Sequence, residues 1–135
     1  MIDFSNLLYV PDGHVWHANR NGEPEEVVIG GTESGPDEGR LALAKLVSED
    51  LDVILTEAKR YVASFMSFDK LGAKGELWVI GLEFGRLPSD RNSDFHVLMS
   101  LDHDDYGLWE VTVRRQTHPQ LKQGFYPVRF SRTEW

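Results

Sequence analysis

Four consecutive residues, Asp102, His103, Asp104 and Asp105, combine three carboxylates with an imidazole between two predicted strands. Oxygen and imidazole ligands of this kind bind divalent cations. A calcium loop of the EF-hand type, however, needs alternating ligands, a glycine and a distant bidentate glutamate, and this run lacks that series. We therefore interpret it as a solvated turn at the tip of a hairpin, and we expect neither a metal nor a cofactor.

A second group with residue types suited to chemistry is Glu83, His96 and Trp109. Glu83 interrupts an apolar run, and a carboxylate placed among Leu77 and Val79 on the second face of a sheet would have a raised pKa suited to acid or base catalysis. Exposure of that face to solvent explains Glu83 more simply. The chain also lacks a GxSxG, HExxH or dinucleotide-binding glycine pattern. We assign no catalytic residue, and the alternative function is a small-ligand-binding or hydrolytic domain with its site near these three side chains.

The chain carries 22 acidic and 14 basic residues, which give a formal net charge of −8. The excess lies in residues 1–108, which hold twenty acidic and nine basic side chains. Such a surface attracts a basic protein and argues against binding to nucleic acid. The candidate partner-binding carboxylates are Glu49, Asp50, Asp52 and Glu57 in the helical segment and Asp102, Asp104 and Asp105 in the hairpin.

The C-terminal part of the chain has the opposite charge balance. Its basic residues are Arg114, Arg115, Lys122, Arg129 and Arg132, interleaved with aromatic side chains. Basic and aromatic side chains together bind nucleic acids through phosphate contacts and base stacking. The acidic remainder opposes this reading, and pairing of these cations with carboxylates on neighbouring strands is the simpler explanation. We expect no nucleic-acid partner.

One long helix is predicted between Ser34 and Phe68. Apolar residues recur at three- and four-residue steps around Leu51 and Ile54, which places them on one stripe that a sheet must cover. Ser34 can cap this helix and Gly72 can terminate it. The other residues predicted on the stripe are Ala44, Val47, Leu55, Ala58, Val62 and Phe65.

Leu46 and Val53 fall nearly opposite this stripe, among charged and polar residues. They form a candidate oligomer interface, although isolated exposed apolar residues are common and need no partner. We expect a monomer or a weak homodimer.

Seven segments alternate in hydrophobicity or lie between turn signals, as strands do. Trp78, Ile80, Leu82 and Phe84 are predicted to share the face that meets the helix. Short connections on both sides of one helix favour an α+β fold: an antiparallel sheet of about six or seven strands in the order ββ β-α-ββββ, with one long helix across one face. The segments are 7–10, 15–18, 27–29, 76–86, 95–101, 109–113 and 126–130.

Length and composition predict one domain over residues 1–135. Cysteine is absent, so disulfides and thiolate metal sites are excluded. The N-terminus has an acidic residue where a signal peptide is basic, and no apolar run is long enough to cross a bilayer. We expect a cytoplasmic protein without membrane contact.

The segment YGLWEV at Tyr106–Val111 and the ending PVRFSRTEW at Pro127–Trp135 resemble small uncharacterised bacterial domains of the polymorphic-toxin immunity-protein type. This resemblance implies a cytoplasmic protein that binds and blocks a toxin, and it brings no catalytic residue. Together with the acidic charge, it leads us to predict a non-catalytic protein-binding domain, an immunity or antitoxin-type inhibitor of a basic partner.

Overall fold

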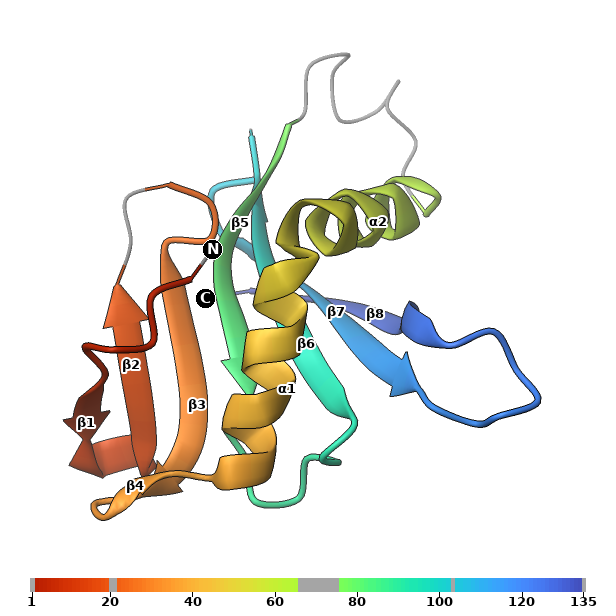
Figure 1. Ribbon diagram of the computed structural model, residues 1–135. Coiled ribbons are helices and arrows are strands. Elements are labelled where there is room, and N and C mark those ends of the chain that lie inside the picture. Colours follow the sequence, from red (N-terminus) through yellow and green to blue (C-terminus); the bar gives the residue numbers. More distant parts are fainter. Residues whose placement is uncertain (1, 20–21, 66–75, 103, 135) are drawn as a thin grey trace.

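The structure, a computed structural model, describes residues 2–19, 22–65, 76–102 and 104–134 (Figure 1). The described residues form an α+β fold with eight strands and two α-helices. In chain order the elements are β1 (Leu8–Val10), β2 (Val15–Asn19), β3 (Glu26–Thr32), β4 (Gly35–Pro36), α1 (Glu38–Glu49), α2 (Leu51–Ala63), β5 (Leu77–Phe84), β6 (Asp94–Leu101), β7 (Gly107–Gln116) and β8 (Gly124–Glu134). All seven segments predicted as strands are strands, and the short β4 is additional.

The strands form one sheet in the order β1-β2-β3-β5-β6-β7-β8, with β4 paired to β3. Every pair is antiparallel except β3 with β5, which run parallel. The expectation of a purely antiparallel sheet is therefore wrong at this pair. The reason is the connection: both helices lie between β3 and β5, and a helical crossover returns the chain to the same end of the sheet.

The expectation of one long helix is also wrong, because the helical segment divides at Asp50. Its backbone angles, φ −116° and ψ 29°, lie outside the helical region. The first helix begins at Glu38, and its N-cap is Asp37 rather than Ser34: the Asp37 carboxylate accepts a hydrogen bond from the backbone N–H of Arg40 at 3.1 Å. The predicted end at Gly72 lies outside the described residues.

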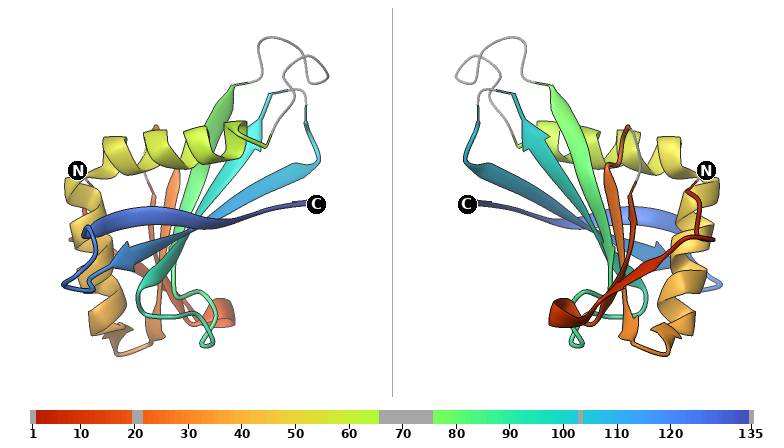
Figure 2. Two further views of the ribbon diagram at one scale, coloured as in Figure 1. Left: turned by 90° about the vertical axis from the view of Figure 1, so that its right-hand side faces the viewer. Right: turned by 90° about the vertical axis from the view of Figure 1, so that its left-hand side faces the viewer.

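The break directs the two helices over different parts of the sheet. Helix α1 contacts β3 and β5, whereas α2 contacts β7 and β8. Figure 2 shows the helices running in different directions on the same side of the sheet. A twisted sheet rotates from strand to strand, so a straight helix of this length would leave part of its apolar stripe uncovered.

The apolar stripe of the helices is buried as predicted around its centre. Leu51 and Ile54 are 8% and 5% exposed, and Val47, Ala58 and Val62 are fully buried. Phe65, also predicted on the stripe, is 58% exposed.

The alternation predicted for β5 is wrong in its first half. Val79 is fully buried in the core and Trp78 is exposed, because the pairing of β5 with β6 shifts register between Val79 and Gly81. Such a bulge reverses which side chains face the helices. As a result Leu82 and Phe84 enter the core as predicted, while Ile80 does not.

Among the described residues, neither helix has the length and apolar character needed to span a bilayer.

Candidate functional site on the uncovered face of the sheet

Both α-helices pack on one face of the sheet, and no described α-helix lies over the other face (Figures 1 and 2). One row of residues crosses this uncovered face in register over seven strands. We call it the central row; its residues are Leu8, His17, Val28, Glu83, His96, Thr112 and Arg129.

The middle of the central row is polar yet buried. Glu83, His96 and Thr112 are 7%, 9% and 4% exposed. Buried polar groups of this kind are costly unless they are hydrogen-bonded, and paired groups form a rigid network. His96 has polar neighbours on both sides of its ring.

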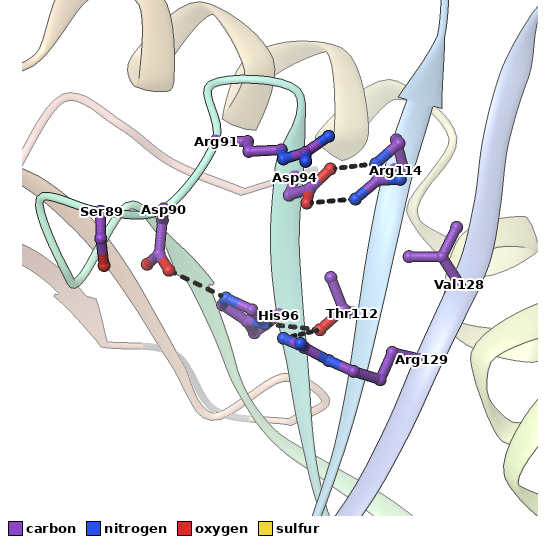
Figure 3. Close-up of a pocket in the computed structure, with 9 residues that line it drawn as sticks. All are labelled: Ser89, Asp90, Arg91, Asp94, His96, Thr112, Arg114, Val128 and Arg129. Atoms are coloured by element: carbon purple, nitrogen blue, oxygen red, sulfur yellow. Dashed lines mark hydrogen bonds and ion pairs between the residues drawn. The ribbon is translucent and has the colours of Figure 1, made fainter.

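His96 lies between two carboxylates. Its Nδ1 is 3.0 Å from an oxygen of Glu110 and 3.1 Å from the hydroxyl of Thr112, and its Nε2 is 3.6 Å from an oxygen of Asp90. Figure 3 shows the ring between Asp90 on one side and Thr112 and Arg129 on the other. The hydrogen bond with Glu110 raises the pKa of His96, helped by the charges of Glu110 and Asp90 and opposed by burial. The same hydrogen bond lowers the pKa of Glu110.

The first hollow on this face, of about 440 Å³, lies beside His96 toward β8. We call it the arginine hollow, because Arg91, Arg114 and Arg129 line it. Arg114 binds the buried carboxylate of Asp94 through two hydrogen bonds, at 2.7 and 3.0 Å. That fork holds the pKa of Asp94 below its ordinary value despite burial.

The second hollow, of about 560 Å³, lies on the β3, β5, β6 and β7 side. Carboxylates, apolar side chains and one cation, Arg86, line it together, and we call it the glutamate hollow. Because Glu110 belongs to this hollow and its partner His96 to the other, the two hollows adjoin at the His96–Glu110 pair. Its carboxylates are Glu25, Glu26, Glu83 and Glu110, and its apolar side chains include Val28, Ile80, Leu98 and Leu108.

The structure unites two of the three residues predicted for a site on the sheet. Glu83 and His96 are directly opposite each other on β5 and β6. Trp109 is in the core on the helix side, where its ring stacks on Phe130 with centroids 5.4 Å apart. Including Trp109 in the site was therefore wrong, as was placing Val79 beside Glu83.

Sequence reasoning missed most of the polar residues around His96. The available signal was alternation: in β7 the core residues Trp109, Val111 and Val113 leave the intervening side chains on the uncovered face. The residues missed are Asp90, Asp94, Glu110, Thr112 and, as a member of this site, Arg129.

The carboxylates predicted to bind a partner lie elsewhere. Glu49, Asp50 and Asp52 are exposed at the junction of α1 and α2, beside a hollow of about 350 Å³. Glu57 pairs with Arg60 at 2.6 Å on α2. These four residues are thus on the helix side, across the sheet from the central row.

In the hairpin between β6 and β7, Asp102 and Asp105 are exposed but Asp104 is engaged. Arg132 donates two hydrogen bonds to Asp104, at 2.9 and 2.7 Å, and the Trp109 indole donates a third at 2.6 Å. The bonds from Arg132 are the main reason that the pKa of Asp104 is lowered. This carboxylate is therefore already neutralised within the chain.

No group of three His, Asp or Glu side chains among the described residues is arranged to hold a metal ion. His103 lies outside the described residues. The expectation that the Asp102–Asp105 turn binds no metal stays a prediction.

Leu46 and Val53 lie on different helices, because the predicted single helix divides between them. Leu46 is half-buried, and Val53 is 65% exposed. The candidate oligomer interface therefore reduces to one exposed side chain on α2.

Comparisons of the chain with protein-family models, curated proteins and solved structures found no match. The resemblance to immunity proteins stays a prediction. The two segments that carry it are neighbours in the structure: Gly107 of β7 pairs with Glu134 of β8, and Val111 pairs with Phe130.

Proposed function

We propose that this chain is a non-catalytic protein-binding domain that binds a basic partner through the uncovered face of its sheet. The observation that carries the proposal is the buried polar centre of the central row, Glu83, His96 and Thr112, between two hollows on a face with no described α-helix over it. Side chains fixed by packing and hydrogen bonds lose little freedom on binding, which favours affinity and specificity.

The extent of the face supports a protein partner. Seven strands spaced about 4.8 Å apart span roughly 30 Å, and a standard interface buries about 800 Å² on each partner. The net charge of −8 and the four carboxylates of the glutamate hollow favour a basic surface on that partner. The resemblance to immunity proteins supports a toxin as the partner, inhibited by occlusion in the cytoplasm.

Pairing within the site supports binding over catalysis. Glu83 pairs with Arg86, His96 with Glu110, and Asp94 with Arg114. A catalytic site needs a nucleophile or base aimed at a substrate atom about 3 Å away, whereas these groups are aimed at one another.

Gene neighbourhood supplies the partner for the test: the product of the gene adjacent to the one encoding this chain. Leu98→Lys places a cation in the glutamate hollow, and we expect it to raise the Kd at least tenfold, the effect of losing a central contact. Val53→Lys makes the same change at an exposed residue of α2 and should leave the Kd unchanged. The opposite pattern would move the interface to the helix side, and no binding to the wild type would remove the proposal's support.

A small-ligand-binding or hydrolytic domain is the second candidate, favoured by the placement of Glu83 directly opposite His96. Hydrolysis of an activated ester by the wild type, lost in His96→Gln with the fold retained, would favour this candidate over the first.

A further inference from the structure

We infer that the glutamate hollow receives one Lys or Arg side chain of the protein partner. This inference rests on the proposed function and names the chemistry that its surface recognises. It concerns only the part of the uncovered face between β3 and β7.

Three carboxylates of the glutamate hollow accept hydrogen bonds from aromatic rings: one from an indole, which carries no charge, and two from imidazoles, which carry none when deprotonated. The indole and a deprotonated imidazole fix the position of a carboxylate and leave its negative charge available to an incoming cation, whereas a protonated imidazole offsets it. The three pairs are Trp78 with Glu25 at 3.2 Å, His17 with Glu26 at 3.0 Å, and His96 with Glu110 at 3.0 Å.

Glu83, the fourth carboxylate, shows that a guanidinium fits this lining. Arg86 contacts it through Nη1, and the Arg86 side chain is otherwise 61% exposed. Among the described residues, Glu25, Glu26 and Glu110 form no ion pair with Lys or Arg. The hollow therefore carries more negative charge than Arg86 offsets.

Apolar side chains complete the lining and narrow the choice of occupant. Val28 is buried, and Ile80, Leu98 and Leu108 are half-buried on this face. Lys and Arg combine an aliphatic stem with a cationic head, so one side chain satisfies both the apolar and the carboxylate parts of the hollow. A wholly apolar occupant would desolvate the carboxylates without compensation.

The test uses the full chain, labelled with ¹⁵N, and the capped peptide acetyl-Leu-Arg-Leu-amide at pH 8. The matched peptide has citrulline in place of arginine, which keeps the shape and removes the charge. We expect the arginine peptide to shift backbone amides of β5, β6 and β7 around the hollow and to bind about fivefold more tightly than the citrulline peptide, as for one partly exposed charge pair.

Glu26→Gln and Glu110→Gln keep an oxygen that accepts the histidine N–H and remove the charge. Each should weaken binding of the arginine peptide about threefold to fivefold. Glu49→Gln, an exposed carboxylate on α1, is the matched control and should have no effect.

Equal affinity for the two peptides, shifts confined to the helices, or unchanged spectra with both peptides would each overturn the inference. The proposed function is tested separately by the whole partner. If Leu98→Lys abolishes binding of that partner while Glu26→Gln and Glu110→Gln do not alter it, the proposed function stands and the side-chain subsite is wrong.

Discussion

At the scale of single residues, the pKa of His96 links the buried polar centre of the central row to a measurable property, the pH dependence of stability. Its pKa is raised in the folded chain, chiefly by the hydrogen bond with Glu110. A raised pKa means that the folded state binds the proton more tightly than the unfolded state does. The resulting stability is fully present below the unfolded pKa of about 6.5 and is lost as the pH rises through the folded pKa.

We therefore predict that the free energy of unfolding of the wild type falls relative to that of His96→Gln as the pH rises from about 6 to 9. Glutamine keeps a hydrogen-bonding side chain at this position and does not titrate. Urea unfolding of both proteins at each pH measures the difference. A constant difference across this range would contradict the prediction.

Gly85 is the residue that fixes the loop carrying Asp90 to the His96 site. Its φ is +68°, and a Cβ added there would lie 2.0 Å from Nε of Arg40. Arg40 in turn donates hydrogen bonds to the carbonyls of Gly85 at 3.1 Å and of Asp90 at 3.3 Å. The arrangement ties helix α1 to this loop through one half-buried side chain.

Gly85→Ala should destabilise the protein by at least about 1 to 3 kcal/mol, since it combines a left-handed backbone with a steric overlap. The control is Gly39→Ala in the first turn of α1, where the nearest atom to an added Cβ is a carboxylate oxygen of Asp37 at 3.6 Å. That change should be neutral or stabilising by up to about 1 kcal/mol. Thermal and urea melts compare the two, and equal stabilities would refute the role of Gly85.

At the scale of elements, the apolar stripe of the helical segment was predictable from the sequence, but its division into two helices was not. Alternation and three- to four-residue spacing depend on local sequence, so the strands and the burial of Leu51 and Ile54 follow from it. The break at Asp50 depends on which strands each helix covers. The bulge after Val79 depends on how β5 pairs with β6. Because the bulge does not change the residue pattern, the face of Trp78 could not be read from sequence, whereas alternation with Val111 and Val113 indicates the face of Trp109.

Leu51→Ala tests the packing of the helix on the sheet. Leu51 is 8% exposed at the start of α2, and removing its side chain from the core should cost about 2 to 5 kcal/mol. Val53→Ala, two residues along the same helix at a side chain that is 65% exposed, should stay within about 0.5 kcal/mol of the wild type. Urea melts that show equal stability for the two variants would mean that the helix does not depend on this contact.

At the scale of the whole molecule, the acidic charge divides between two faces. The helix junction exposes Glu49, Asp50 and Asp52, while the uncovered face holds the carboxylates of the glutamate hollow. The sequence predicted the first group and, of the second, singled out only Glu83, because alternation indicates the face of a strand residue but not which strands lie beside it. Both groups attract a basic protein at long range, and only one lies in the proposed contact.

Both groups of carboxylates attract the partner at long range, and only those of the glutamate hollow are proposed to contact it. Changing the salt concentration distinguishes long-range attraction from contact. The Debye length is about 30 Å at 0.01 M salt and about 8 Å at 0.15 M, and a helix layer and a sheet layer, each about 10 Å thick, stand between the two groups. Neutralising the junction with Glu49→Gln, Asp50→Asn and Asp52→Asn should therefore slow association at 0.01 M and leave it unchanged at 0.15 M. Neutralising the hollow with Glu26→Gln and Glu110→Gln should slow association at both salt concentrations and also speed dissociation, because those charges contact the partner. Stopped-flow or surface-based kinetics with the protein from the adjacent gene give both rates, and a junction variant that still matters at 0.15 M would place the contact on the helices.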